Sequence, residues 1–158
     1  MKRQIFLMLC PLFLLLSSCH KCEVAEYLGD YSFKTSGKVS ATGVGTSVNY
    51  TLPEKIGTMH VMKSGDGEHD VMITMNEVGG AVYTMYGDVE DGALTIASYE
   101  KELDLKLLSL IGEPLTVKVS GTGEIHDDVL VLTQSYWGRK EDMLISGHDI
   151  LTVAERNE

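Results

Sequence analysis

Most of the chain alternates apolar and polar residues with a period of two, the pattern of β-strands whose successive side chains point to opposite faces. The alternating runs are separated by the turn residues Gly65-Asp66-Gly67, Gly79-Gly80 and Asp91-Gly92. Such turns need positive φ angles, which glycine adopts at little cost, so they favour hairpins. We therefore expect four consecutive antiparallel strands, near residues 58–63, 69–75, 81–86 and 93–97.

The same pattern continues toward the end of the chain. Residues 115–120 alternate cleanly and are expected to pair with residues 129–133 across a turn at residues 126–128. Residues 149–154 are expected to form a closing strand, and residues 31–52 an early hairpin. The whole arrangement is typical of one antiparallel β domain.

One segment departs from the period of two. Residues 99–111 place apolar side chains at helical spacing, and Gly112 and Pro114 follow as signals for the end of a helix. A strand is the alternative, because residues 103–107 also alternate. We expect one short helix near residues 99–111.

Some strands are apolar on both faces. Leu130 and Leu132 would point to one face of their strand, and Val129 and Val131 to the other. A sheet with one solvated face needs apolar side chains on its buried face alone. A barrel with a helix across its outside needs them on both faces of the covered strands. The predicted fold is therefore mainly β, an antiparallel meander forming a barrel or a strongly curved sheet.

Methionine is frequent in the middle of the chain, with five residues between Met59 and Met85. Its flexible side chain adapts to irregular or variable partners. One interpretation is ordinary core packing. The other is a pliable apolar cavity, and in that case Met75 and Met85 are candidate ligand-binding residues.

The first nineteen residues indicate export rather than folded structure. Lys2 and Arg3 precede an apolar run at residues 5–16, as in a secretory signal. The run is too short for a transmembrane helix, which needs about 20 apolar residues. It ends in Leu16-Ser17-Ser18-Cys19, which resembles the lipobox of bacterial lipoproteins. A plain secretory signal that ends near Ser18 is the alternative.

The lipobox interpretation divides the chain into three parts. Residues 1–18 would be a signal peptide, and residues 19–26 a short tether lipidated at Cys19. Residues 27–158 would be a single domain, with structure beginning near Tyr27. No Asp follows Cys19, which favours the outer membrane of the cell envelope and leaves its periplasmic and surface faces open.

The net charge of the chain limits the classes of partner that it can bind. Without Lys2 and Arg3, 23 acidic residues face 11 basic ones, so the formal net charge is −12. Nucleic acids and anionic lipid headgroups are negatively charged and attract basic residues. Because this chain is acidic, we expect it to bind neither of them through charge. We expect acyl chains to hold the protein at the membrane.

The lipobox, the segment Tyr27-Leu28-Gly29-Asp30-Tyr31 and the later pair at residues 115–121 and 128–132 together resemble small calycin-like lipoproteins of the Bacteroidetes. The resemblance concerns the layout of the whole mature chain and implies a lipocalin-like barrel. It carries no functional residue over, since members mostly lack an assigned activity. The expected helix and the irregular first hairpin depart from simple up-and-down closure.

Candidate chemistry is sparse. The chain has no nucleophile elbow, phosphate loop or His-Glu-x-x-His helix, so we expect no enzyme activity and no cofactor. The pairs His126-Asp127 and His148-Asp149 fall at expected turns, where such residues serve the turn conformation. A metal site would need three or four converging ligands, and we predict none.

Tyr136-Trp137-Gly138-Arg139-Lys140 is the one cluster of aromatic and basic residues. At the rim of a barrel, Tyr136, Trp137 and Arg139 would be candidate ligand-binding residues. The alternative is that Trp137 plugs the barrel end with Arg139 packed over it.

The sequence thus predicts a membrane-anchored, non-enzymatic envelope lipoprotein that binds a small apolar or amphiphilic ligand inside its β domain. The second hypothesis is a protein-interaction or scaffold module of the outer membrane, with no small ligand and an envelope protein as its partner. A hydrolase is a third, and it would require a cleft with converging carboxylates or histidines.

Overall fold

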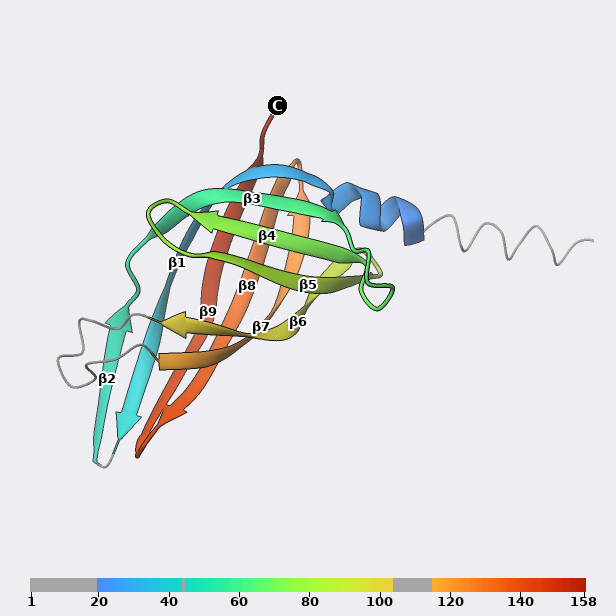
Figure 1. Ribbon diagram of the computed structural model, residues 1–158. Helices are drawn as coiled ribbons and strands as arrows, with labels where there is room; N and C mark the ends of the chain where they lie inside the picture. The colour runs from blue at the N-terminus through green and yellow to red at the C-terminus, as the bar shows by residue number, and fades with distance from the viewer. Residues whose placement is uncertain (1–19, 44, 104–114) are drawn as a thin grey trace, which may run out of the picture.

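The computed structural model describes residues 20–43, 45–103 and 115–158. Its strands form one antiparallel sheet that closes on itself into a barrel (Figure 1). In chain order they are β1 (Gly29–Gly43), β2 (Thr46–Thr51), β3 (Lys55–Lys63), β4 (Val71–Glu77), β5 (Val82–Glu90), β6 (Ala93–Leu103), β7 (Leu115–His126), β8 (Val129–Lys140) and β9 (Met143–Arg156).

The barrel has eight strand positions, because β2 and β3 share one. Both pair antiparallel with β1, β2 along its second half and β3 along its first half. From β3 onward each strand pairs with the next, and β9 returns to pair with β1. The connectivity is therefore up-and-down throughout, and the closure that the early hairpin put in doubt is complete.

Long, bent strands close the ring. β1 and β9 pair from Tyr31 opposite Arg156 to Thr42 opposite Leu144, with an irregularity between Ser36 and Lys38. Such bulges bend a strand and increase its twist. At this bend a Cβ on Gly37 would lie 2.8–3.1 Å from atoms of Ile150, so the two strands approach as closely as glycine allows.

The predicted hairpins are confirmed. The runs at residues 58–63, 69–75, 81–86 and 93–97 lie in or overlap β3 to β6, and 115–120 pairs with the strand containing 129–133. Asp91 and Gly92 both have positive φ in the turn between β5 and β6. This is the turn geometry that an Asp-Gly pair favours between antiparallel strands.

The helix expected near residues 99–111 is not present in its first part. Residues 99–103 lie in β6, where Tyr99 pairs with Val119 and Leu103 with Leu115. Tyr99 and Leu103 fit a period of two as well as a helical stripe, and pairing with the apolar strand β7 selects the strand. The rest of the expected helix, residues 104–111, lies outside the described residues.

A helix instead covers residues 20–27, most of the segment expected to be a tether. Val24 and Tyr27 are three positions apart, so they share one face of this helix, and both are buried. Folded structure therefore begins before Tyr27. The helix lies against one end of the barrel (Figure 1).

The interior holds two apolar clusters. One lies toward the helix and includes Tyr27, Ile73, Met75, Met85 and Leu132, all with no exposed surface. The other lies under the far halves of β1, β7, β8 and β9, and includes Val39, Val117, Ile145 and Ile150. Hydrophobic burial in these clusters is the main source of the barrel's stability.

Candidate functional site

The helix closes one end of the barrel. The Tyr27 hydroxyl donates a hydrogen bond to the Gly92 carbonyl oxygen at 2.7 Å and lies 3.3 Å from that of Gly123. The Tyr31 hydroxyl donates to the Tyr27 carbonyl oxygen at 2.8 Å. Tyr27 therefore fills the space between the strand ends while its polar atoms remain satisfied, which burial requires.

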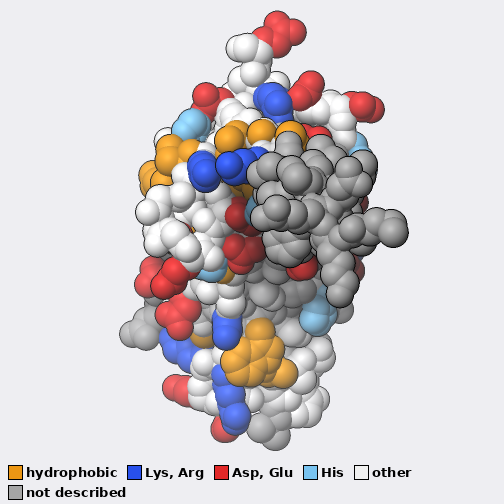
Figure 2. Space-filling model, turned by 90° about the vertical axis from the view of Figure 1, so that its right-hand side faces the viewer, with side chains coloured by type: hydrophobic (Ala, Val, Ile, Leu, Met, Phe, Trp, Pro, Cys, Tyr) orange, Lys and Arg blue, Asp and Glu red, His pale blue; other side chains and the backbone are white. Residues whose placement is uncertain are grey.

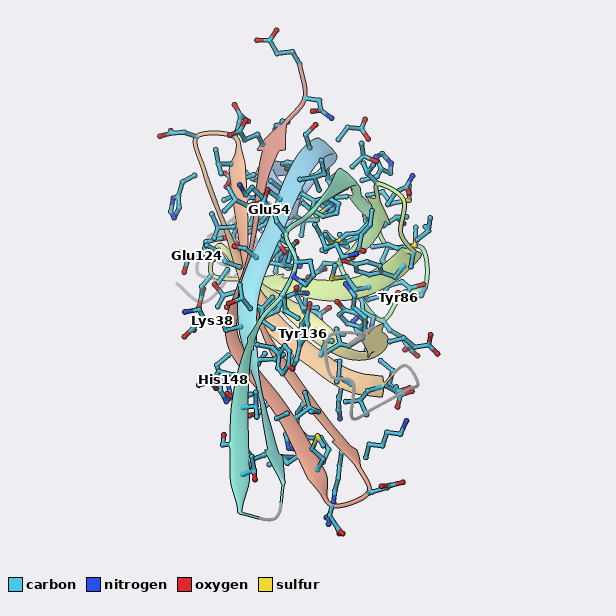
Figure 3. The ribbon with its side chains drawn as sticks, turned by 90° about the vertical axis from the view of Figure 1, so that its left-hand side faces the viewer. Lys38, Glu54, Tyr86, Glu124, Tyr136 and His148 are labelled. Atoms are coloured by element: carbon cyan, nitrogen blue, oxygen red, sulfur yellow. The ribbon has the colours of Figure 1, made fainter. Side chains whose placement is uncertain are left out.

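The opposite end contains a cavity of about 670 Å³. It is bordered by the start of β3, the turn between β4 and β5, and the end of β6, with Tyr136 of β8 in its wall. These strand ends all lie away from the helix. Figure 3 looks onto this end, with Tyr136 inside the ring of strands and Tyr86 at its outer edge.

An ion-pair cluster lies in the cavity wall. The Lys101 ammonium contacts Glu77 Oε1 at 3.0 Å, and the Lys55 ammonium lies 3.6 Å from Glu77 Oε2. The side chains of Glu77 and Lys101 are only 7% and 16% exposed, whereas that of Lys55 is 48% exposed. Burial lowers the pKa of Lys101, and the Glu77 carboxylate opposes that shift. We call these three residues the charged cluster.

Aromatic side chains surround the charged cluster. Tyr83 stacks against Tyr99 with ring centroids 6.2 Å apart, and the Lys101 ammonium lies 4.0 Å from the Tyr83 ring centroid. The Gln134 amide donates a hydrogen bond to the Tyr99 hydroxyl at 3.1 Å. A cation over an aromatic face is attracted to the ring's negative face. Lys101 is thus fixed from two sides.

The tyrosines remain protonated at neutral pH. Burial raises the pKa of Tyr99 to about 12, although the Gln134 hydrogen bond acts against the shift. Burial, followed by the charges of neighbouring phenols and of Glu77, also raises the pKa values of Tyr83 and Tyr136. Around the charged cluster these phenols can therefore donate hydrogen bonds as neutral groups.

Of the five predicted ligand-binding residues, the structure places only Tyr136 at the cavity. Met75 and Met85 are fully buried in the apolar cluster next to the helix. Trp137 points outward and is 57% exposed, so it does not plug the barrel. Arg139 donates from Nε to the Glu141 carbonyl oxygen at the exposed β8–β9 turn. Tyr136 and Trp137 diverge because neighbours along a strand face opposite sides.

Sequence reasoning missed the charged cluster, although a signal was present. Along β4, the inward positions are Val71, Ile73, Met75 and Glu77, so the alternation places a carboxylate inside the barrel. Lys101 likewise falls in phase with Tyr99 and Leu103 on β6. A charged residue at an inward position of a strand is the feature that identifies this site.

The histidines occupy the other end of the barrel or its outer surface. His20 of the helix lies 3.1 Å from Asp70, His69 lies 3.2 Å from Asp88, and His60 contacts Asp30. These are separate His–Asp pairs. Within residues 20–43, 45–103 and 115–158, no group of three or more His, Cys, Asp or Glu is placed to hold a metal ion.

In the same described part of the chain, no helix is both long enough and apolar enough to cross a membrane. No family model, curated protein or solved structure matches this sequence.

Proposed function

We propose that this protein binds a small amphiphilic molecule in the cavity at the end of its barrel opposite the helix. The observation that carries the proposal is the cavity of about 670 Å³, bordered by apolar and aromatic side chains and by the charged cluster. Ligand sites in proteins usually enclose about 300–1,000 Å³ and combine an apolar lining with a few polar groups. The eight-stranded barrel supports the likeness to lipocalin-like proteins.

The position that we propose for such a ligand is near the mouth of the cavity. Met75 and Met85, which were expected to line a pliable cavity, are fully buried among other apolar side chains. The ligand would instead rest nearer the mouth, against Tyr83, Leu103 and Tyr136. We propose a binding role for this cavity rather than an enzymatic one.

The proposal includes a membrane anchor in the cell envelope. Residues 1–18 would be removed as a signal peptide and Cys19 lipidated, with the outer membrane as the expected location. Cys19 is bonded directly to His20, the first residue of the described helix. An anchor there would hold the closed end of the barrel toward the membrane and leave the cavity facing away from it. Loss of radiolabelled palmitate incorporation in Cys19→Ser, but not in Cys22→Ser, would support this part.

A cavity-filling pair of variants tests the binding proposal. Ala81 borders the cavity, whereas the next residue, Val82, is exposed on the outside. Ala81→Trp should remove the small molecules that native mass spectrometry and solvent extraction detect with the wild-type protein, and Val82→Trp should retain them. Equal ligand content in both variants, or none in the wild-type protein from its own cells, would contradict the proposal.

A second candidate function is contact with another envelope protein, and the outer face of β8 and β9 favours it. Trp137 and Leu144 are exposed there, and Lys118 of β7 lies opposite Trp137. Figure 2 shows an apolar patch between basic side chains on the lower part of one face. Exposed Trp beside basic residues is a common composition of interaction sites. Cross-linking in whole cells should then capture a partner that Trp137→Ser loses and Val82→Ser keeps, since Val82 is exposed on β5.

A further inference from the structure

The charged cluster has the opposite sign to the rest of the protein. Its two ammonium groups and one carboxylate give it a formal charge of +1, while the chain without residues 1–18 has a formal charge of −12. A solvated acidic surface needs no buried cation. Lys101 is nevertheless only 16% exposed and is held in place by both Glu77 and the Tyr83 ring. Burying a charged side chain is costly, so its retention at a cavity points to a ligand.

Within the charged cluster, hydrogen-bond donors exceed acceptors. Each lysine ammonium has three N–H donors and no acceptor, whereas the Tyr83 phenol is already hydrogen-bonded to Glu77. Glu77 contributes the one carboxylate of the charged cluster, and Lys101 and Lys55 both approach it. The Lys55 ammonium lies beyond hydrogen-bond distance at 3.6 Å, and it is half-exposed toward the cavity. The unused donors can be satisfied by a group that accepts several hydrogen bonds.

The acidic residues at the rim do not reverse this balance. Glu100 and Glu102 border the cavity, but they flank Lys101 on β6 and both are exposed. Because side chains alternate along a strand, their carboxylates point to the outer face while Lys101 points inward. They are therefore solvated, and water screens their charges more than those of the buried cluster.

We infer that the ligand is an organic anion, whose anionic group binds Lys101 and Lys55 while its apolar part rests against Leu52, Pro53 and Leu103. A carboxylate fits the donors that converge from the two lysines. This inference rests on the proposed binding function and adds the charge of the ligand to it.

Three probes with the same ten-carbon chain test the inference: decanoate, decanol and decyltrimethylammonium. Isothermal titration calorimetry on the full-length protein should give the tightest binding for decanoate. Lys55→Gln should weaken decanoate binding about two- to five-fold, because a half-exposed charge contributes modestly, and should leave decanol binding unchanged. Lys34→Gln is the matched control, since Lys34 pairs with Glu54 on the outside.

The Glu77→Gln variant distinguishes a site that binds anions from a site that binds cations. It removes the carboxylate that competes for both lysines, so decanoate should bind at least as tightly as to the wild-type protein. If decyltrimethylammonium binds best to the wild-type protein and is lost in Glu77→Gln, the site recognises cations and the inference is wrong. Equal binding of all three probes would also overturn it but leave the binding function standing. If none of the probes binds, and the protein from its own cells carries no ligand, the proposed function fails as well.

Discussion

The two ends of this barrel are built from the same strands and yet differ in what they enclose. At the helix end, Tyr27 and the strand residues around Met75 form a fully buried apolar cluster. At the other end, Glu77 and Lys101 take inward positions on the same strands, next to a cavity. The comparison shows that one end is organised for stability, while the other retains charges whose burial is costly.

The largest expected effect concerns the packed end. Met75→Ala should lower the free energy of unfolding by about 2–5 kcal/mol, because it removes buried methylene groups and leaves a void. Urea unfolding followed by circular dichroism measures this. Met62→Ala is the matched control, since Met62 is exposed on β3 and should change stability by less than about 0.5 kcal/mol. Similar losses in both variants would show that the helix end is not tightly packed.

The next largest effect on stability is expected at the charged cluster, at the cavity end of the barrel. Lys101→Met should cost about 1–3 kcal/mol, because Glu77 would keep a nearly buried carboxylate with only the half-exposed Lys55 beside it. Replacing both residues, as Glu77→Leu with Lys101→Met, should recover most of that loss. The same urea titration measures all three proteins, with Lys118→Met as an exposed control on β7. If the double variant is less stable than the single one, the pair contributes net stability and its placement needs no ligand.

A smaller effect is expected at the Tyr27 hydroxyl. Tyr27→Phe keeps the ring that fills the closed end but leaves the Gly92 carbonyl oxygen without its donor. The loss should be about 0.5–1.5 kcal/mol, the usual net contribution of one hydrogen bond. Tyr86→Phe, on the outside of β5, should change little. Thermal unfolding distinguishes the two, and an unchanged midpoint in Tyr27→Phe would mean that the hydroxyl does not help to fix the helix.

The smallest effect is a pH dependence at the helix end. Burial alone would raise the pKa of Asp70, but hydrogen bonds from the Val89 N–H and His20 outweigh it and lower that pKa. A lowered pKa means that the unfolded chain binds the proton more tightly. The contribution to stability is therefore present above about pH 4 and is lost as the pH falls below that value.

Asp70→Asn should accordingly flatten the fall in stability between about pH 5 and pH 3, by less than about 1 kcal/mol for a partly exposed pair. Unfolding in urea at several pH values measures the slope. Asp142→Asn, in the turn between β8 and β9, is a control that should leave it unchanged. A slope in Asp70→Asn equal to that of the wild-type protein would show that Asp70 does not hold the helix.

Local chemistry made much of the fold predictable. The Asp-Gly and Gly-Gly turns and the period of two located most of the hairpins, because a turn conformation depends on the residues within it. The segment at residues 99–103 was misjudged, since Tyr99 and Leu103 suit either period and pairing with Val119 and Leu115 decides between them. Such pairing is a tertiary effect that local propensity does not contain.

The candidate site was less predictable for a similar reason. Alternation alone places Glu77 and Lys101 inside their strands, but the two residues meet only when β4, β5 and β6 curve into a closed ring. The cluster around Trp137 has the aromatic and basic composition of a binding site, but its position on β8 turns the Trp137 side chain outward. The phase of a residue within its strand was therefore more informative than its chemical type.

The central claim is that the cavity end of the barrel binds ligands and the helix end does not. Amide chemical-shift mapping by NMR, with decanoate added to the full-length protein, tests it most directly. The account predicts shift changes concentrated at residues 77–83 and 100–103 and at Tyr136, with Tyr27 and Met75 unchanged. Changes centred on Tyr27, Met75 and Met85, or spread over the outer surface around Trp137, would contradict it.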